Sequence, residues 1–286
     1  MHWQTSRRKI SLTQPIVMGI LNVTPDSFSD GGEFLSADDA LRRAERMILG
    51  GADIIDIGGE STRPSSERVD AATEMRRTLP VVAAIAKRFD TPISIDTSRS
   101  EVAAAAVEQG AEIINDISGL RWDPFIADIA ARTGAGLVLM HSRGIFETMH
   151  SEPPVDDILR EVIHGFIASI RVAKDRGVAD EHLALDIGVG FGKTFRQNLE
   201  LLAKLDTIVA EFEDYPMLVG ASRKSFIGRI LDDAPVSKRL GGSIAAALVA
   251  VKNGATIVRV HDVTETVAAL RTLSAIGDGV GSDEDR

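Results

Sequence analysis

Short apolar runs alternate with longer amphipathic segments along almost the whole chain. Each apolar run is only a few residues long and stops at glycine or at a polar residue, which is typical of a strand buried on both faces. The amphipathic segments between them have the length and spacing of surface helices. We expect strands at 16–21, 53–57, 92–95, 112–114, 136–140, 183–185, 216–220 and 256–260. We expect helices at 36–49, 71–87, 99–109, 124–132, 156–176, 198–209 and 242–252, and a last helix ending near residue 276.

Eight strand–helix units in succession predict an α/β fold, a single-domain (β/α)8 TIM barrel over residues 1–276. No linker-like composition separates the units, and no G-x-G-x-x-G turn follows the first strand, which disfavours a doubly wound sheet. Residues 1–14 are polar and mixed, and we expect a short N-terminal hairpin that closes the bottom of the barrel. Residues 277–286 are rich in glycine and acidic side chains and are expected to form a disordered tail.

Composition narrows the class of protein further. Hydrophobic residues make up 44% of the 286, and the formal net charge of −10 argues against a nucleic-acid-binding surface. Cysteine is absent, which excludes disulfides, zinc–thiolate sites and thiol nucleophiles. No apolar run approaches the roughly 18 residues of a membrane span. We expect a cytoplasmic protein that uses neither a membrane nor a nucleic acid.

Polar side chains stand at the end of every predicted strand. In a barrel of this type the carboxyl ends of the strands converge on one mouth, where the active site lies. Any one of these residues could be a strand cap, but all of them together indicate a binding site. They are Asn22, Thr62, Arg63, Asp96, Asn115, His141, Asp186, Ser222, Lys224, Arg259 and His261.

These residues fall into two chemical groups. Arg63, Arg259 and His261, with Asn22 and Thr62, are suited to bind phosphate oxygens. The amide oxygen of Asn22 is also a ligand that Mg²⁺ accepts when phosphates and water fill its other positions. The second group is Asp96, Asn115, Asp186 and Lys224, whose buried acceptors and cation can recognise a flat heterocycle with adjacent N–H donors.

Seven strings of the sequence resemble the dihydropteroate synthase family, in the same order, over residues 16 to about 275. They are Met18–Gly32, Gly58–Pro64, Ser94–Thr97, Asn115–Asp116, Gly190–Lys193, Ser222–Ser225 and Arg259–Asp262. The resemblance implies an enzyme that condenses 6-hydroxymethyl-7,8-dihydropterin diphosphate with p-aminobenzoate, giving 7,8-dihydropteroate and diphosphate. It also implies Mg²⁺ as cofactor, inhibition by sulfonamides and a homodimer.

The resemblance assigns roles to individual residues. The pterin is expected at Asp96, Asn115, Asp186, Lys224, Met140, Phe191 and Gly220. The diphosphate is expected at Asn22, Thr62, Arg63, Arg259 and His261, with the metal at Asn22. p-Aminobenzoate is expected beside Phe28, Thr62, Pro64, Phe191, Lys224 and Ser225. The expected catalytic residues are Asp96, Lys224, Arg63, Arg259 and His261.

Four positions depart from the family pattern: Ile187, Ser65, Ser142 and Arg143, where the family usually has Pro, Gly, Met and Gln. Three other functions stay open at this point. A pterin-dependent methyltransferase shares the barrel and the pterin contacts but has no diphosphate to hold. A Schiff-base aldolase could use Lys224 as its nucleophile. A non-catalytic barrel could bind a pterin without turning it over.

Overall fold

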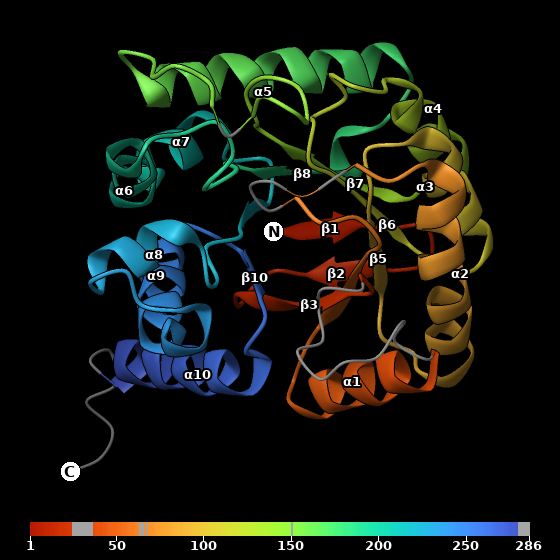
Figure 1. Cartoon of the computed structure of the whole chain (residues 1–286), viewed down its shortest axis with the longest axis horizontal. Coiled ribbons are helices and arrows are strands. Elements are labelled where there is room, and N and C mark those ends of the chain that lie inside the picture. The colour runs from red at the N-terminus through yellow and green to blue at the C-terminus, as the bar shows by residue number, and fades with distance from the viewer. Residues whose placement is uncertain (25–36, 63–65, 67, 150, 280–286) are drawn as a thin grey trace.

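The strands form one closed parallel barrel. The computed structural model describes residues 1–24, 37–62, 66, 68–149 and 151–279. The strands follow the order β10-β3-β4-β5-β6-β7-β8-β9 around the barrel (Figure 1). Their bounds are β3 Ile16–Asn22, β4 Ile54–Gly58, β5 Ile93–Asp96, β6 Ile113–Asp116, β7 Gly136–Met140, β8 Leu183–Asp186, β9 Met217–Val219 and β10 Ile257–Val260. The predicted TIM barrel is confirmed.

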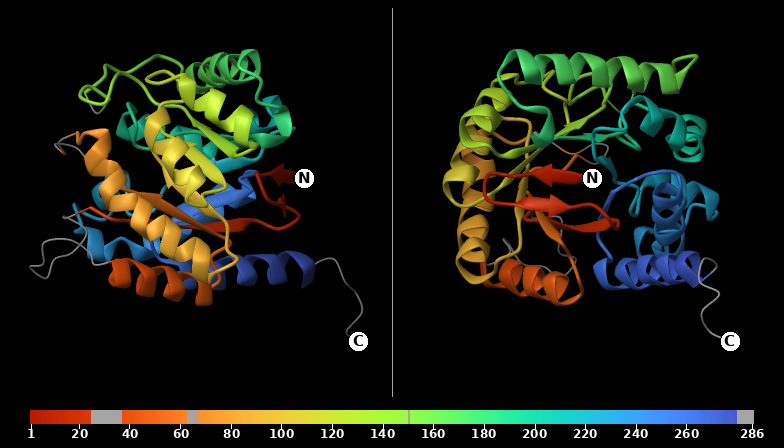
Figure 2. Two further views of the ribbon diagram at one scale, coloured as in Figure 1. Left: turned by 90° about the vertical axis from the view of Figure 1, so that its right-hand side faces the viewer. Right: turned by 180° about the vertical axis from the view of Figure 1, so that it is seen from behind.

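The helices surround this barrel on its outside (Figures 1 and 2). They are α1 Ala37–Leu49, α2 Ala71–Arg88, α3 Ser100–Glu108, α4 Phe125–Thr133, α5 Ile158–Asp175, α6 Phe195–Ala203, α7 Leu205–Glu211, α8 Ser225–Ile230, α9 Leu240–Lys252 and α10 Val263–Gly279. Within the described residues, the short 3₁₀ helices η2 and η3 cover Asp180–His182 and Val236–Lys238. No helix in the described part of the chain is long and apolar enough to cross a bilayer.

The helices differ from the prediction in three places. The helix expected at 198–209 is two helices: a capping box between Thr194 and Gln197 starts α6 earlier, and Asn253 Nδ2 donates to the carbonyl of Leu202 near its end at 2.8 Å. The short helices η2, α8 and η3 were not expected. The last helix extends to Gly279, while residues 280–286 of the predicted tail lie outside the described residues.

The period-two pattern of the strands divides the core into two parts. Alternate residues such as Val17, Ile55 and Leu137 face outward and pack against the helices. The residues between them, such as Met18 and Ile54, face inward and fill the lower half of the barrel. The barrel is therefore a packed core, and only its upper end can hold a ligand.

The N-terminal hairpin closes the bottom of the barrel, as predicted. Strands β1 (His2–Gln4) and β2 (Lys9–Ser11) pair antiparallel. Trp3 is fully buried within the interior cluster, and its indole Nε1 donates to the carbonyl of His182 at 2.9 Å. The hairpin fixes which end of the barrel is open.

Candidate active site

The polar mouth follows from the same period-two pattern that builds the interior. On most strands the residue two positions beyond an interior apolar residue also faces the inside, one layer higher. Ile54 is followed by Asp56, Ile113 by Asn115, and Ile257 by Arg259. The upper layer comprises Asp56, Asp96, Asn115, Met140, Asp186, Gly220 and Arg259, together with Asn22, which lies one further step along β3, beyond Ile20. We call it the polar layer.

A pocket of about 400 Å³ opens at the carboxyl ends of the strands. Its lining includes nine of the predicted residues: Asn22, Thr62, Asp96, Gly220, Ser222, Lys224, Ser225, Arg259 and His261. The structure therefore brings the two predicted groups together at one mouth. Phe28, Arg63 and Pro64 lie outside the described residues.

Arg259 lies between the two predicted groups. Its Nε donates to Asp56 Oδ2 and its Nη2 to Asp96 Oδ2, both at 2.6 Å. Asn115 Nδ2 donates to the same Asp56 oxygen at 3.1 Å. Asp56 Oδ1 is buried and has no partner among the described residues. One guanidinium thus compensates two carboxylates, and a buried acceptor stays available to a ligand.

Burial at the mouth moves the pKa of these groups. It raises the pKa of Asp96 to about 7, with Arg259 acting in the opposite direction and Asp56 adding to the rise. For Arg259 burial alone would lower the pKa, but the carboxylates of Asp56 and Asp96 outweigh it and raise the pKa. Asp96 therefore titrates in the physiological range while Arg259 keeps its charge.

Asp186 and Lys224 lie on the other side of the mouth. Asp186 is 4% exposed, and its Oδ1 accepts from the backbone N–H of Gly188 at 2.7 Å. Burial raises the pKa of Asp186. Burial, together with Arg259, lowers the pKa of Lys224 to about 8. The Lys224 ammonium lies 4.0 Å from the ring centroid of Phe191, in cation–π contact.

The loop from β8 to α6 folds around a buried lysine. Lys193 Nζ donates to three backbone carbonyls, those of His141 at 3.0 Å, Gly188 at 2.8 Å and Phe191 at 3.0 Å. The glycine at position 188 has φ +63°, and a Cβ there would lie 1.9 Å from the His141 carbonyl oxygen. Only glycine allows this close approach. Lys193 thus fixes Phe191 beside Lys224.

His261 is positioned from its own strand end. Its Nδ1 lies 3.1 Å from Ser222 Oγ, which also accepts from the His261 backbone N–H. Burial and the nearby guanidinium of Arg223 hold the pKa of His261 well below its ordinary value. The imidazole is therefore neutral before a ligand arrives. Arg223 itself forms an ion pair with Asp262.

The base of the loop after β4 is anchored by charged groups. Arg99 pairs with Glu60 at 3.1 Å and with Glu74, and it also donates to the carbonyl of Val69. Arg77 Nη1 donates to the carbonyl of Gly59 at 2.8 Å. These contacts fix Gly59 and Glu60, and so position Thr62, which follows them and lines the pocket.

Four predicted pterin contacts are absent from the lining of the pocket: Asn115, Asp186, Met140 and Phe191. Asn115 and Asp186 are buried at the strand ends that surround it. Met140 and Phe191 pack with Ile117, Phe146 and Met149 in a small apolar cluster. Phe191 contacts the pocket-lining Lys224 through its ring. Met140 lines a second cavity behind β7.

Sequence reasoning missed Asp56 and Lys193 as parts of the site. Asp56 had a signal, because it is a charged residue in an apolar strand and lies two positions beyond the interior residue Ile54. Lys193 follows Gly188, Gly190 and Gly192, and all three adopt positive φ. Alternating glycines can turn successive carbonyls toward one point, and a lysine next to such a run was the available signal.

Together, the closed parallel barrel and its polar pocket define the class: a TIM-barrel enzyme with a small-molecule site at the carboxyl ends of its strands. Residues 18–261 match the family described as pterin binding enzyme. The dihydropteroate synthase of Escherichia coli (strain K12) is 50% identical over 268 residues, covering 93% of both chains.

Solved structures agree with this assignment. The Yersinia pestis dihydropteroate synthase with a sulfonamide drug complex has TM-score 0.91 and 44% identity, covering 97% of this chain and 100% of that one. The Xanthomonas albilineans dihydropteroate synthase with 4-aminobenzoic acid has TM-score 0.90 and 39% identity, covering 97% and 99%. The chain belongs to the dihydropteroate synthase family of pterin-binding enzymes.

Proposed function

We propose that this chain is a transferase of folate biosynthesis, joining the methylene carbon of 6-hydroxymethyl-7,8-dihydropterin diphosphate to the amine of p-aminobenzoate. A carbon–nitrogen bond forms, the carbon–oxygen bond to diphosphate breaks, and the amine loses a proton. The observation that carries the proposal is the polar layer with Arg259 at its centre, because it offers heterocycle acceptors and anion donors in one pocket.

The residues divide the work by charge. Asp186, Asn115 and the unpartnered oxygen of Asp56 offer the acceptors that ring N–H groups of a pterin require. Asp96, as a carboxylate, stabilises positive charge that develops on the pterin as diphosphate departs. Arg259, Arg63 and the neutral donor His261 bind the departing diphosphate, and Lys224 contacts an acceptor on the pterin ring.

p-Aminobenzoate needs no general base to act, since an aromatic amine is uncharged and nucleophilic at neutral pH. It lies against Phe191, Lys224 and Ser225, with Thr62, Phe28 and Pro64 completing its pocket. Sulfonamides compete for the same place, in keeping with the drug bound by the Yersinia pestis relative.

The donor set at the mouth also fits Mg²⁺. Among the described residues no group of three or more His, Asp or Glu side chains is placed to hold a metal. A Cβ on Gly58 would lie 3.3 Å from Asn22 Oδ1, so this glycine leaves the amide oxygen uncovered. We propose Asn22 as one protein ligand, with diphosphate and water supplying the rest. The ion would neutralise charge on the leaving group.

A homodimer is proposed from the surface. Five exposed large apolar side chains fall on α8, η3, α9 and the turns beside them: Ile230, Leu231, Val236, Leu240 and Val249. A surface of this kind is typical of a protein–protein interface. Val249→Glu should convert dimer to monomer in sedimentation, and an unchanged mass would contradict the proposal. Location in the cytoplasm stays a prediction.

The experiment that tests the function is diphosphate release from the pterin diphosphate, with and without p-aminobenzoate. Release that depends on p-aminobenzoate, with formation of dihydropteroate, is expected. A pterin-binding barrel without catalysis would release none, and release at equal rates with and without the amine would contradict a synthase.

A further inference from the structure

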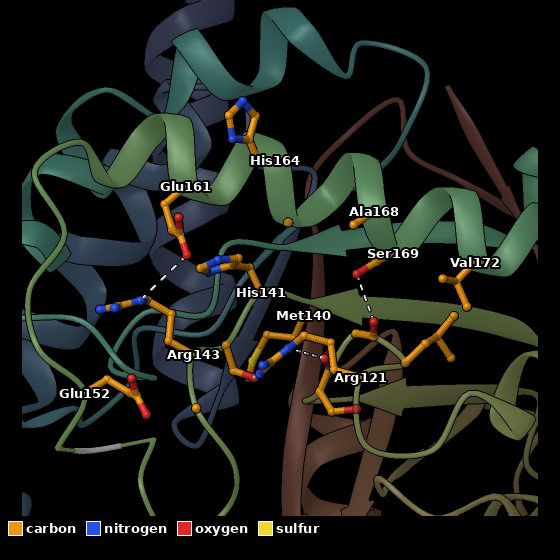
Figure 3. A pocket seen from close by; sticks show the side chains of 16 residues that line it. Arg121, Met140, His141, Arg143, Glu152, Glu161, His164, Ala168, Ser169 and Val172 are labelled. Atoms are coloured by element: carbon orange, nitrogen blue, oxygen red, sulfur yellow. Dashed lines mark hydrogen bonds and ion pairs between the residues drawn. The ribbon is translucent and has the colours of Figure 1, made fainter.

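A second cavity of about 490 Å³ lies outside the barrel wall, between α5 and the loops after β6 and β7 (Figure 3). It shares no lining residue with the pocket at the mouth. One face of α5 forms its wall through Glu161, Gly165, Ala168 and Val172, which recur at helical spacing. The small side chains in the middle of this face leave the space open.

One end of the cavity carries a cation whose hydrogen-bond partners are neutral. Arg121 donates from Nη2 to Ser142 Oγ at 2.8 Å and from Nε to the carbonyl of Ser118 at 3.2 Å. No carboxylate of the described residues lies within ion-pair distance of this guanidinium. Its remaining N–H groups can still donate to the carboxylate of a ligand, and such charge-assisted pairs are among the strongest polar contacts.

The other end carries an excess of negative charge. Glu161 lies 3.8 Å from Arg143 Nε, a loose ion pair, and Arg143 Nη1 is already bonded to the carbonyls of Pro153 and Gly192. Glu152 accepts from the hydroxyl of Thr148 at 2.9 Å, and it forms no ion pair with any described residue. Figure 3 shows Glu152, Glu161 and Arg143 on one side of the cavity and Arg121 on the other.

Between the two ends lies an imidazole with an unsatisfied nitrogen. His141 is 7% exposed, and its buried Nδ1 has no hydrogen-bond partner among the described residues. The ring packs against α5, since a Cβ on Gly165 would lie 2.4 Å from its Cδ2. A buried polar atom without a partner costs free energy and is expected where a ligand or water completes the contacts.

We propose that this cavity binds a small aminocarboxylate, a molecule with a carboxylate at one end, an ammonium group at the other and a short apolar body. The carboxylate pairs with Arg121 and Ser142. The ammonium lies between Glu152 and Glu161. The apolar body covers Ala168 and the His141 ring. A ligand with two negative charges is disfavoured because the two glutamates face the same space.

The probe is 4-(aminomethyl)benzoate, titrated by calorimetry into the whole protein, with benzoate and benzylamine as matched probes that each lack one charged end. Each matched probe is expected to bind at least about tenfold more weakly, since each loses one charged contact. Arg121→Gln should weaken the full probe by a similar factor. Asp186→Asn, which changes the mouth, should leave its affinity unchanged.

Ala168→Phe is the second variant, because it fills the cavity without removing a charge. It should abolish probe binding while the melting temperature and the rate of dihydropteroate formation stay near those of the unchanged protein. The proposal is overturned if the probe gives no heat up to about 10 mM. It is also overturned if Arg121→Gln and Ala168→Phe bind the probe as well as the unchanged protein, or if saturating dihydropteroate displaces it.

Discussion

Arg259 is the residue on which most of the mouth depends. It is a single guanidinium that bonds to Asp56 and Asp96, while both carboxylates also belong to the proposed pterin contacts. From the sequence alone Arg259 belonged to the diphosphate group and Asp96 to the pterin group. In the structure Arg259 is hydrogen-bonded to Asp96, so a substitution of Arg259 should also change the affinity for the pterin.

Asp186→Asn should weaken pterin binding about 10- to 150-fold, the value of one lost charge-assisted contact in a buried site. Asparagine can still accept from the Gly188 N–H, so the loop should keep its shape. Calorimetry with a phosphate-free pterin measures the loss. Asp206→Asn, an exposed change on α7, is the control and should leave affinity intact; equal affinities in both variants would contradict the placement.

The pH profile of kcat/KM for the pterin substrate should fall as pH drops below about 7, because protonation removes the negative charge of Asp96. Arg259→Gln should move the midpoint to higher pH, since Arg259 lowers the pKa of Asp96. The decrease at low pH should disappear in Asp96→Asn. This variant therefore distinguishes titration of Asp96 from ionisation of the substrate itself. A decrease that survives in Asp96→Asn would assign the titration to another group.

At the scale of elements, the sequence predicted the strands far better than the segments between them. A strand buried on both faces can be recognised from its own apolar residues, and β4 at Ile54–Gly58 lies within one residue of the predicted range 53–57 at each end. Helix ends depend on partners far along the chain, such as Asn253 contacting the carbonyl of Leu202. The period-two rule also predicts which strand residues face the mouth. The three hydrogen bonds of Lys193 could not be predicted in this way, because they depend on the conformation of the whole loop from β8 to α6.

Lys193→Met should reduce kcat/KM for p-aminobenzoate at least about tenfold, because the loop loses three charge-assisted bonds and Phe191 is no longer fixed beside Lys224. Lys193→Arg should restore part of the loss, since it keeps the charge. Lys204→Met, an exposed change at the end of α6, should have no effect. A lower melting temperature with unchanged kcat/KM would show that Lys193 only stabilises the fold.

For the whole molecule, the hairpin at the bottom matters for stability and not for chemistry. Trp3→Ala should lower the free energy of unfolding by about 3–5 kcal/mol, from the lost burial and the cavity left behind. Its bond to the carbonyl of His182 is lost as well. Urea unfolding measures this, with Lys9→Ala in the same hairpin as the control. Equal stability of the two variants would mean that Trp3 is not part of the barrel core.

The layering of the barrel interior has a consequence for how such an enzyme can change over generations. One strand step separates the residues that hold the barrel together from those that meet the ligand, as Ile54 and Asp56 show. Substitutions below that step change the stability of the barrel and leave its substrate specificity unchanged. Substitutions above it alter substrate choice while the scaffold persists. An engineer seeking heat tolerance and one seeking new chemistry can therefore work on the same chain with separate sets of positions.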